Sequence, residues 1–229
     1  MNSNTRREIP VVGETKHAFG RFAAAAFLLA ALAGCSIIPE PTADPTRYYL
    51  LGEPAPTQAT TMAATNSPAE GALHVGLRGV DLPAYLRSGR SIVVRKTSNE
   101  VRYEEYARWA EPLDAAVLRA VREKLLASDR IATADTPPFV GETKRDLDIS
   151  IRVLRCEGTL GENGKGGVQF VATYDVFNPS KGGALVLRRT FVAPPAEWNG
   201  SNFGELVQRL SDAVSALGAD IAENLPTLR

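Results

Sequence analysis

The chain has 229 residues, and its 26 basic and 26 acidic side chains give no net charge. That balance provides no basic footprint for nucleic acid, so we expect no nucleic-acid partner. With only two histidines and two cysteines in the whole chain, a His/Cys metal site or a thiol–imidazole catalytic pair has little material, and we expect no metal and no cofactor.

The N-terminal segment has the pattern of a signal peptide. Basic residues precede an uncharged apolar run over 22–34, which is shorter than the roughly 20 residues of a membrane-spanning helix. The run leads into "LAGC", which resembles the lipobox of bacterial lipoproteins and implies cleavage after Gly34 and lipidation of Cys35. Ser36 is not the aspartate that retains lipoproteins at the inner membrane, which implies the outer membrane. The alternative is an ordinary secretory signal with a chance cysteine.

This interpretation sets the domain boundaries. We expect a signal peptide at 1–34, a lipidated tether at 35–46 and a single domain at 47–229 with a flexible Pro- and Thr-rich loop at 53–71. The mature chain keeps 22 basic and 24 acidic residues, a net charge of about −2. Cys156 is then the one free cysteine, and we expect it to be a buried, inert thiol.

In the first half of the domain, the sequence pattern predicts strands followed by one helix. Alternating segments indicate strands at 47–52, 72–83, 91–97 and 100–109, the last two joined in a hairpin across Ser98-Asn99. An amphipathic helix is predicted from Pro112 to Ser128, because proline is favourable in the first helical turn.

The second half repeats this order. Strands are predicted at 146–155, 166–178 and 184–193, and a long amphipathic helix follows, with Asn202 and Glu205 at the spacing of a capping box. The pattern indicates an α+β fold. We expect one sheet of about six strands, mainly antiparallel or mixed, covered by two amphipathic helices on one face.

Candidate catalytic patterns fail in detail. "GTLGENGKGG" at 158–167 has the wrong glycine spacing for a phosphate-binding loop, and Gly166 stands where Ser or Thr would hold magnesium. Asp146 and Asp148 alternate with Leu147 and are expected on the solvated face of a strand. We therefore predict that the protein is not an enzyme.

Three segments carry a family resemblance: "VDLPAYL" at 80–86, "IVVR" at 92–95 and "EYARWAEPL" at 105–113. Together with the lipobox, they resemble the ABC-type transport auxiliary lipoproteins (PqiC/YmbA-like, membrane integrity-associated transporter subunits). The resemblance implies a compact α/β domain and a non-catalytic role at the periplasmic face of the outer membrane. The implied partners are an MCE-domain protein spanning the periplasm and an inner-membrane permease, which together move lipids or other hydrophobic molecules between the membranes.

The family motif contains Glu105, Arg108, Trp109, Glu111 and Pro112. It falls where a predicted strand ends and a predicted helix begins. In one interpretation it is a structural corner, with the indole buried between helix and sheet and the arginine paired with a nearby glutamate. In the other it docks on the MCE partner, because Trp and Arg are enriched at binding hot spots.

Fold alone does not determine function. The competing hypothesis is a lipoprotein adaptor of another envelope system, such as an activator of cell-wall synthesis or a secretion component. Exposed strand edges would also permit a homo-oligomer.

Overall fold

A computed structural model describes residues 43–52, 71–139, 144–161 and 166–227. The predicted signal peptide, most of the tether, nearly all of the 53–71 loop and the dipeptide Asn163-Gly164, which is typical of a hairpin turn, lie outside these residues. The compact unit that follows the tether spans Pro45–Arg229. Within the described part of the chain, no helix has the length and apolarity needed to cross a membrane.

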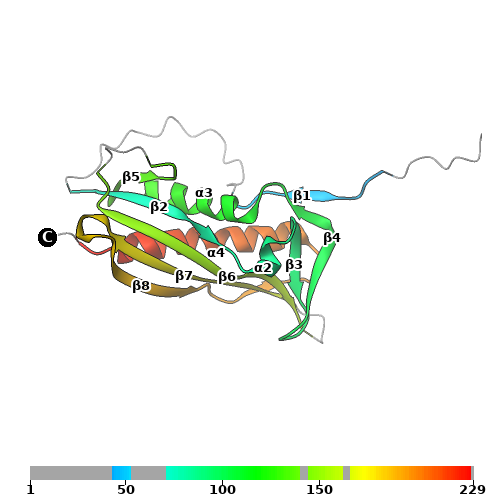
Figure 1. Ribbon diagram of the computed structural model, residues 1–229. Helices are drawn as coiled ribbons and strands as arrows, with labels where there is room; N and C mark the ends of the chain where they lie inside the picture. The colour runs from blue at the N-terminus through cyan, green and yellow to red at the C-terminus, as the bar shows by residue number, and fades with distance from the viewer. Residues whose placement is uncertain (1–42, 53–70, 140–143, 162–165, 228–229) are drawn as a thin grey trace, which may run out of the picture. The chain divides into compact units, whose positions relative to one another are not determined.

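The described residues of this unit form nine strands and three α-helices (Figure 1). The strands are β1 (Arg47–Tyr49), β2 (Leu73–Asp81), β3 (Ser91–Arg95), β4 (Val101–Trp109), β5 (Ile131–Asp135), β6 (Leu147–Leu160), β7 (Gly166–Asn178), β8 (Ala184–Val192) and β9 (Ala196–Trp198). The helices are α2 (Ala84–Arg87), α3 (Leu113–Leu126) and α4 (Phe203–Asn224), with a 3₁₀ turn, η2, at Pro179–Lys181.

The sheet is mixed and centres on the long antiparallel pair β6–β7. One edge of β6 pairs in parallel with β2 and, farther along, with β3. β5 extends the sheet beyond β2, and β4 and β1 extend it beyond β3. On the edge away from β6, β7 pairs antiparallel with β8 and β9. The predicted hairpin 91–109 is confirmed as the antiparallel pair β3–β4.

The α+β class is confirmed, whereas the expected six strands and two helices are too few. β5 and β9 were missed because they are only five and three residues long. Segments this short carry little periodicity, and their pairing with β2 and β7 defines them as strands. The one-turn helix α2 was missed for the same reason, since it has four residues.

The two long helices form the layer over the sheet (Figure 1). They approach closely at Gly218, where a Cβ atom would lie 2.7 Å from the Cβ atom of Lys124. The predicted cap of α4 is present, because the Asn202 side chain accepts a hydrogen bond from the Glu205 amide at 3.3 Å. Their buried face comprises mainly Leu113, Ala116, Val117, Val121, Leu125, Leu206, Leu210, Val214, Leu217 and Ile221.

Strand alternation separates the two faces of the sheet. Ile149, Ile151 and Val153 of β6 are buried, as predicted. In β7 the Tyr174 hydroxyl donates to Asp220 Oδ2 of α4 at 2.7 Å, so this residue points toward the helix layer. The intervening residues of both strands, such as Arg152, therefore point to the opposite face.

Asp148 corrects the prediction of a solvated carboxylate. It is buried, and it accepts hydrogen bonds from Arg145 Nε at 2.8 Å and Arg78 Nη2 at 3.1 Å. Asp148 can be buried because Gly76 lies opposite it on the neighbouring strand β2. A Cβ atom there would come within 2.6 Å of Arg145 Cδ, so the missing side chain lets Arg145 cross over and cover the carboxylate. Asp146 accepts from the His74 amide at 2.9 Å, and His74 is exposed, as predicted.

Candidate functional site

The family motif forms the corner between β4 and α3. Trp109 ends β4 with a side chain that is only 4% exposed. Its amide donates to the Arg90 carbonyl at 2.7 Å, and the next amide, of Ala110, donates to Tyr49 in β1 at 2.8 Å. Pro112 then occupies the position before the first helical residue, and its carbonyl accepts from Ala116 at 3.0 Å. The corner is therefore fixed from both sides by main-chain bonds.

Glu111 takes Arg119 of α3 as its partner instead of Arg108. Arg119 Nη2 lies 2.6 Å from Glu111 Oε1 and 2.8 Å from the Leu51 carbonyl, so this side chain joins the corner to the chain after β1. The hydrogen bond that Arg119 donates to Glu111 raises the pKa of Arg119, which stays charged. Arg108 is exposed, and its Nε donates to the main-chain carbonyl of Glu105 at 3.3 Å.

The structure thus divides the motif into two parts. Trp109 is buried and Glu111 is half-buried, whereas Glu105 and Arg108 are exposed. Tyr48 of β1 pairs in register with Arg108, and Tyr48 is 61% exposed. The inner part contacts the fold, and the outer part is available at the β1 edge of the sheet.

Replacement of Glu111 by alanine is expected to lower the free energy of unfolding by about 0.5–1 kcal/mol, because the pair with Arg119 is partly screened by solvent. The control is Glu123→Ala, which removes the longer Arg119 contact of 3.5 Å and is expected to cost less. Urea unfolding of both variants measures the difference. Equal losses would contradict a special role for the Glu111 contact.

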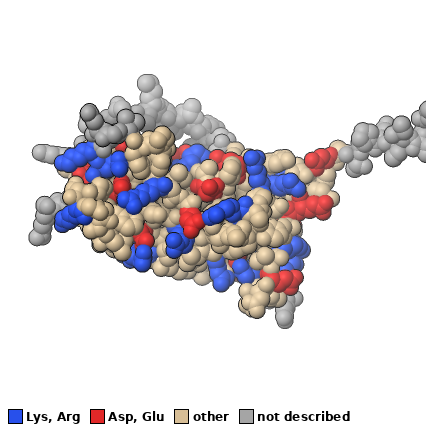
Figure 2. Space-filling model, viewed as in Figure 1, with Lys and Arg blue, Asp and Glu red and all other residues tan. Residues whose placement is uncertain are grey.

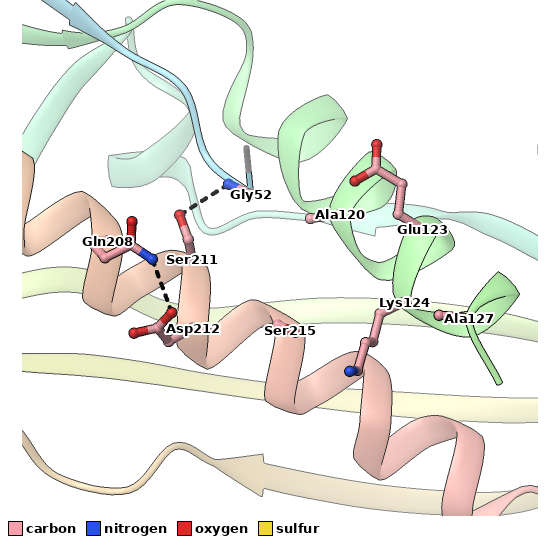
Figure 3. A pocket seen from close by; sticks show the side chains of 9 residues that line it. All are labelled: Gly52, Ala120, Glu123, Lys124, Ala127, Gln208, Ser211, Asp212 and Ser215. Atoms are coloured by element: carbon pink, nitrogen blue, oxygen red, sulfur yellow. Dashed lines mark hydrogen bonds between the residues drawn. The ribbon is translucent and has the colours of Figure 1, made fainter. Parts of the chain in front are cut away.

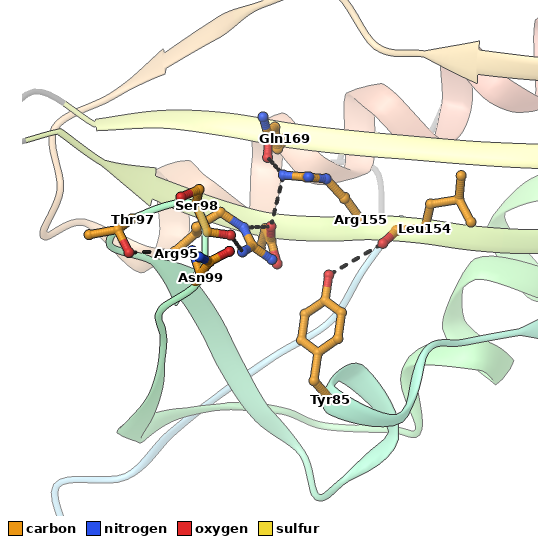
Figure 4. A network of polar contacts seen from close by, with 9 residues as sticks. Tyr85, Arg95, Thr97, Ser98, Asn99, Leu154, Arg155 and Gln169 are labelled. Atoms are coloured by element: carbon orange, nitrogen blue, oxygen red, sulfur yellow. Dashed lines mark hydrogen bonds and ion pairs between the residues drawn. The ribbon is translucent and has the colours of Figure 1, made fainter.

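A second polar cluster lies where β3 meets β6 (Figure 4). Glu157 is 0% exposed, and its Oε1 lies 2.5 Å from Arg95 Nε. Arg95 also donates from Nη1 to the Ser98 carbonyl at 2.9 Å, while Glu157 Oε2 is buried with no hydrogen-bond partner. Arg155 contributes a more distant charge, with its Nη1 4.0 Å from Glu157 Oε1. The cluster is a buried ion pair with one oxygen left unsatisfied.

Tyr85 of α2 closes this cluster. Its hydroxyl donates to the Leu154 carbonyl at 3.3 Å, and the Arg95 guanidinium lies 5.9 Å from its ring centroid. Burial, and then the negative charge of Glu157, raise the pKa of Tyr85 to about 12, so it remains a neutral donor. Tyr85 and Arg95 come from the segments 80–86 and 92–95 that carry the family resemblance.

Cys156 precedes Glu157 and is buried, as predicted. Burial, reinforced by the charge of Glu157, raises the pKa of its thiol to about 12. Because the thiolate is the reactive form, we expect no modification by a maleimide in the native protein and complete modification in urea, measured by mass spectrometry. Rapid modification of the native protein would contradict this. The chain used should carry Cys35→Ser, which removes the other thiol.

A cavity of about 450 Å³ opens between α3 and α4 beside Gly52 (Figure 3). The Gly52 amide donates to Ser211 Oγ at 2.9 Å, and Gln208 Nε2 donates to Asp212 Oδ1 at 3.1 Å. A second cleft, of about 270 Å³, lies between β1, β4 and the start of α4. In the part of the chain that the structure describes, no hydrogen bond joins a serine of either lining to an acidic or basic side chain. Among the described residues, no group of three or more His, Cys, Asp or Glu is placed to hold a metal ion.

Comparisons with known proteins identify the fold. The crystal structure of a DUF330-family protein from Xanthomonas campestris matches with a TM-score of 0.58 and 16% identity, over 72% of this chain and 89% of that chain. A second crystal structure, of an uncharacterized protein, gives a TM-score of 0.51 at 16% identity, over 67% and 92%. The similarity to a PelC dodecamer from Paraburkholderia phytofirmans is weaker, with a TM-score of 0.36 and 16% identity over 66% and 87%.

Sequence comparison gives the family itself. A search of curated proteins found no significant match. The family model for the ABC-type transport auxiliary lipoprotein component matches residues 49–222. This range includes the described strands except the first two residues of β1, all of α3, and α4 except its last two residues. The chain therefore belongs to the ABC-type transport auxiliary lipoprotein family.

Proposed function

We propose that this protein is the non-catalytic auxiliary subunit of an MCE-type ABC transport system, which moves lipids or other hydrophobic molecules between the inner and outer membranes. The observation that carries the proposal is the family match over residues 49–222. Membership of the family implies association with a transport system. The MCE-domain protein and the inner-membrane permease are the partners that we propose within it.

The proposed location is the periplasmic face of the outer membrane. The support comes from the sequence: the "LAGC" string places lipidation at Cys35 after cleavage at Gly34, and Ser36 follows in place of an aspartate. A tether of residues 35–46 can span at most about 40 Å when extended. The domain would therefore stay close to the membrane while its partners reach it across the periplasm.

The geometry of the motif suggests a division of labour. We assign Trp109, Glu111 and Pro112 to the corner, because their contacts lie within the fold. Arg108 and Glu105 are exposed, and Arg108 lies in register with Tyr48, so we assign both to partner docking at the β1 edge. Arg108→Ala should then weaken partner binding while leaving the melting temperature unchanged.

Affinity purification of the lipidated protein from cross-linked cell envelopes tests the function, with mass spectrometry of the proteins recovered. An MCE-domain protein and its permease among the strongest hits would support the proposal. Recovery of cell-wall synthases or secretion components in their place would favour the adaptor of another envelope system. In that case the fold assignment would stand and the proposed partners would be wrong.

A further inference from the structure

The face of the sheet opposite α3 and α4 is open to solvent and rich in arginine. It is formed by β6, β7 and β8 and faces the viewer in Figures 1 and 2, where basic side chains are distributed across it. The side chains of Arg152 and Arg188 are each 67% exposed. We call this surface, together with the adjoining ends of β2 and α2, the arginine face, and define it by six charged residues: Arg87, Arg152, Arg155, Arg188, Asp81 and Asp175. Arg78 and Arg145 form a separate group with the buried Asp148.

Guanidinium groups outnumber carboxylates on the arginine face by four to two. Asp81 is shared, with Arg87 Nη2 at 2.6 Å and Arg152 Nε at 3.2 Å. Asp175 is held by Arg188 through two bonds of 2.6 and 2.7 Å, and this pairing lowers the pKa of Asp175.

Among the residues that the structure describes, Arg155 has no exposed carboxylate as its partner on this face. Its Nη1 donates to the neutral amide oxygen of Gln169 at 2.8 Å. The carboxylate of Glu157, 4.0 Å away, is buried and already bound by Arg95. The arginine face therefore carries about two uncompensated positive charges, although the mature chain as a whole is slightly acidic. Each guanidinium has five donors in a planar fork, and the bonds above use only a few of them.

An apolar row lies beside these charged pairs on the arginine face. The register pairs Val171 of β7 with Val192 of β8 on one side and with Arg155 of β6 on the other, next to Leu154. Leu154 is exposed, and Val192 is 65% exposed. Arginine is enriched at protein–protein interfaces, and the exposed apolar side chains beside it add surface that a partner can bury.

We propose that the arginine face docks an acidic segment of a periplasmic subunit of the transport system. This inference rests on the proposed function and names the chemistry of the partner surface. Planar guanidinium groups pair with carboxylates in a bidentate geometry, as Arg188 already does with Asp175. The apolar row would be covered in the same contact.

A protein fits this face better than a phospholipid surface does. Membrane-facing surfaces favour exposed Trp and Tyr with Lys and Arg, whereas the exposed apolar side chains of the row are Leu154 and Val192. The exposed Asp81 carboxylate would also be brought against lipid phosphates. In a protein interface it can remain paired with its two arginines.

The test uses the full-length lipidated protein with a photo-crosslinking amino acid at Val192 in living cells. A matched position on the helix layer, Leu126, is also exposed and serves as the control. Each crosslinking position is placed in the wild-type protein and in the double variant Arg152→Glu plus Arg188→Glu. The charge-matched control pair is Arg102→Glu plus Arg209→Glu, two exposed arginines outside the arginine face. Thermal unfolding of the purified variants verifies folding, and glutamine replaces glutamate if the reversal variant does not fold.

The expected result is a crosslink from Val192, and none from Leu126, to an Asp- and Glu-rich segment of a transport subunit. Its yield should fall about tenfold or more in the Arg152/Arg188 variant and stay unchanged in the Arg102/Arg209 variant. A crosslink to phospholipid or to a second copy of this chain would overturn the inference, as would equal yields in the two variants. If cross-linked envelopes still give the MCE protein while Val192 gives no crosslink to it, the inference fails and the proposed function stands. If the wild type recovers no transport subunit, the proposed function itself fails.

Discussion

Replacement of Arg95 by alanine is expected to lower the free energy of unfolding by about 3–5 kcal/mol, because it leaves a buried carboxylate without its cation. Glu157 is fully buried, and its Oε1 lies 2.5 Å from Arg95 Nε. The other oxygen already has no hydrogen-bond partner, so the carboxylate has nothing else to compensate it at short range. Arg155, at 4.0 Å and directed to Gln169, is too distant to take over. Urea unfolding followed by circular dichroism measures the loss.

The matched control is Arg102→Ala on the neighbouring strand β4, which breaks a pair with Glu104 in which the arginine is 46% exposed, and it should cost under about 1 kcal/mol. Adding Glu157→Gln to Arg95→Ala removes the uncompensated charge and should restore part of the stability. If Arg95→Ala costs no more than the control, or if the second substitution restores nothing, the loss does not come from a buried charge.

Periodicity predicted the elements that carry their own hydrophobic face. β7 has the predicted bounds, and α4 begins within one residue of its predicted cap. β5 escaped prediction because its five residues include two alanines and no run of branched side chains. Its place in the sheet depends on β2, whose residue Leu73 pairs with Ile131 fifty-eight positions along the chain. Contacts of that range cannot be read from local alternation.

The burial of the polar residues also depends on long-range contacts that local alternation does not reveal. Glu157 lies beyond the register shift of β6 between Val153 and Arg155, which local alternation does not reveal, and Tyr85 and Arg95 from earlier segments cover it. Asp148 was predicted to be solvated, and it is buried because Gly76 on the next strand leaves room for Arg145. In both cases the environment is decided by a residue on another strand. The sequence identified Trp109 and Glu111 because their corner is local, spanning the end of β4 and the start of α3.

Replacement of Trp109 by alanine is expected to lower the free energy of unfolding by about 3–5 kcal/mol, the range for truncating a buried aromatic side chain. The indole is 4% exposed and belongs to the single hydrophobic core that joins the sheet to α3. Trp109→Phe keeps part of the ring volume and should cost less than half as much. Urea unfolding of the lipid-free chain measures both.

Tyr48→Ala is the matched control, because Tyr48 is an aromatic residue one position from Trp109 in the register of β1 and β4, and it is exposed. It should leave the free energy of unfolding within about 0.5 kcal/mol of the wild type. If Trp109→Ala folds and is as stable as the wild type, the corner assignment is wrong, and Trp109 would be assigned to partner docking. A large loss with Trp109→Ala, and loss of partner binding without unfolding in Arg108→Ala, would instead show that one short motif serves the fold with its buried residues and the partner with its exposed ones.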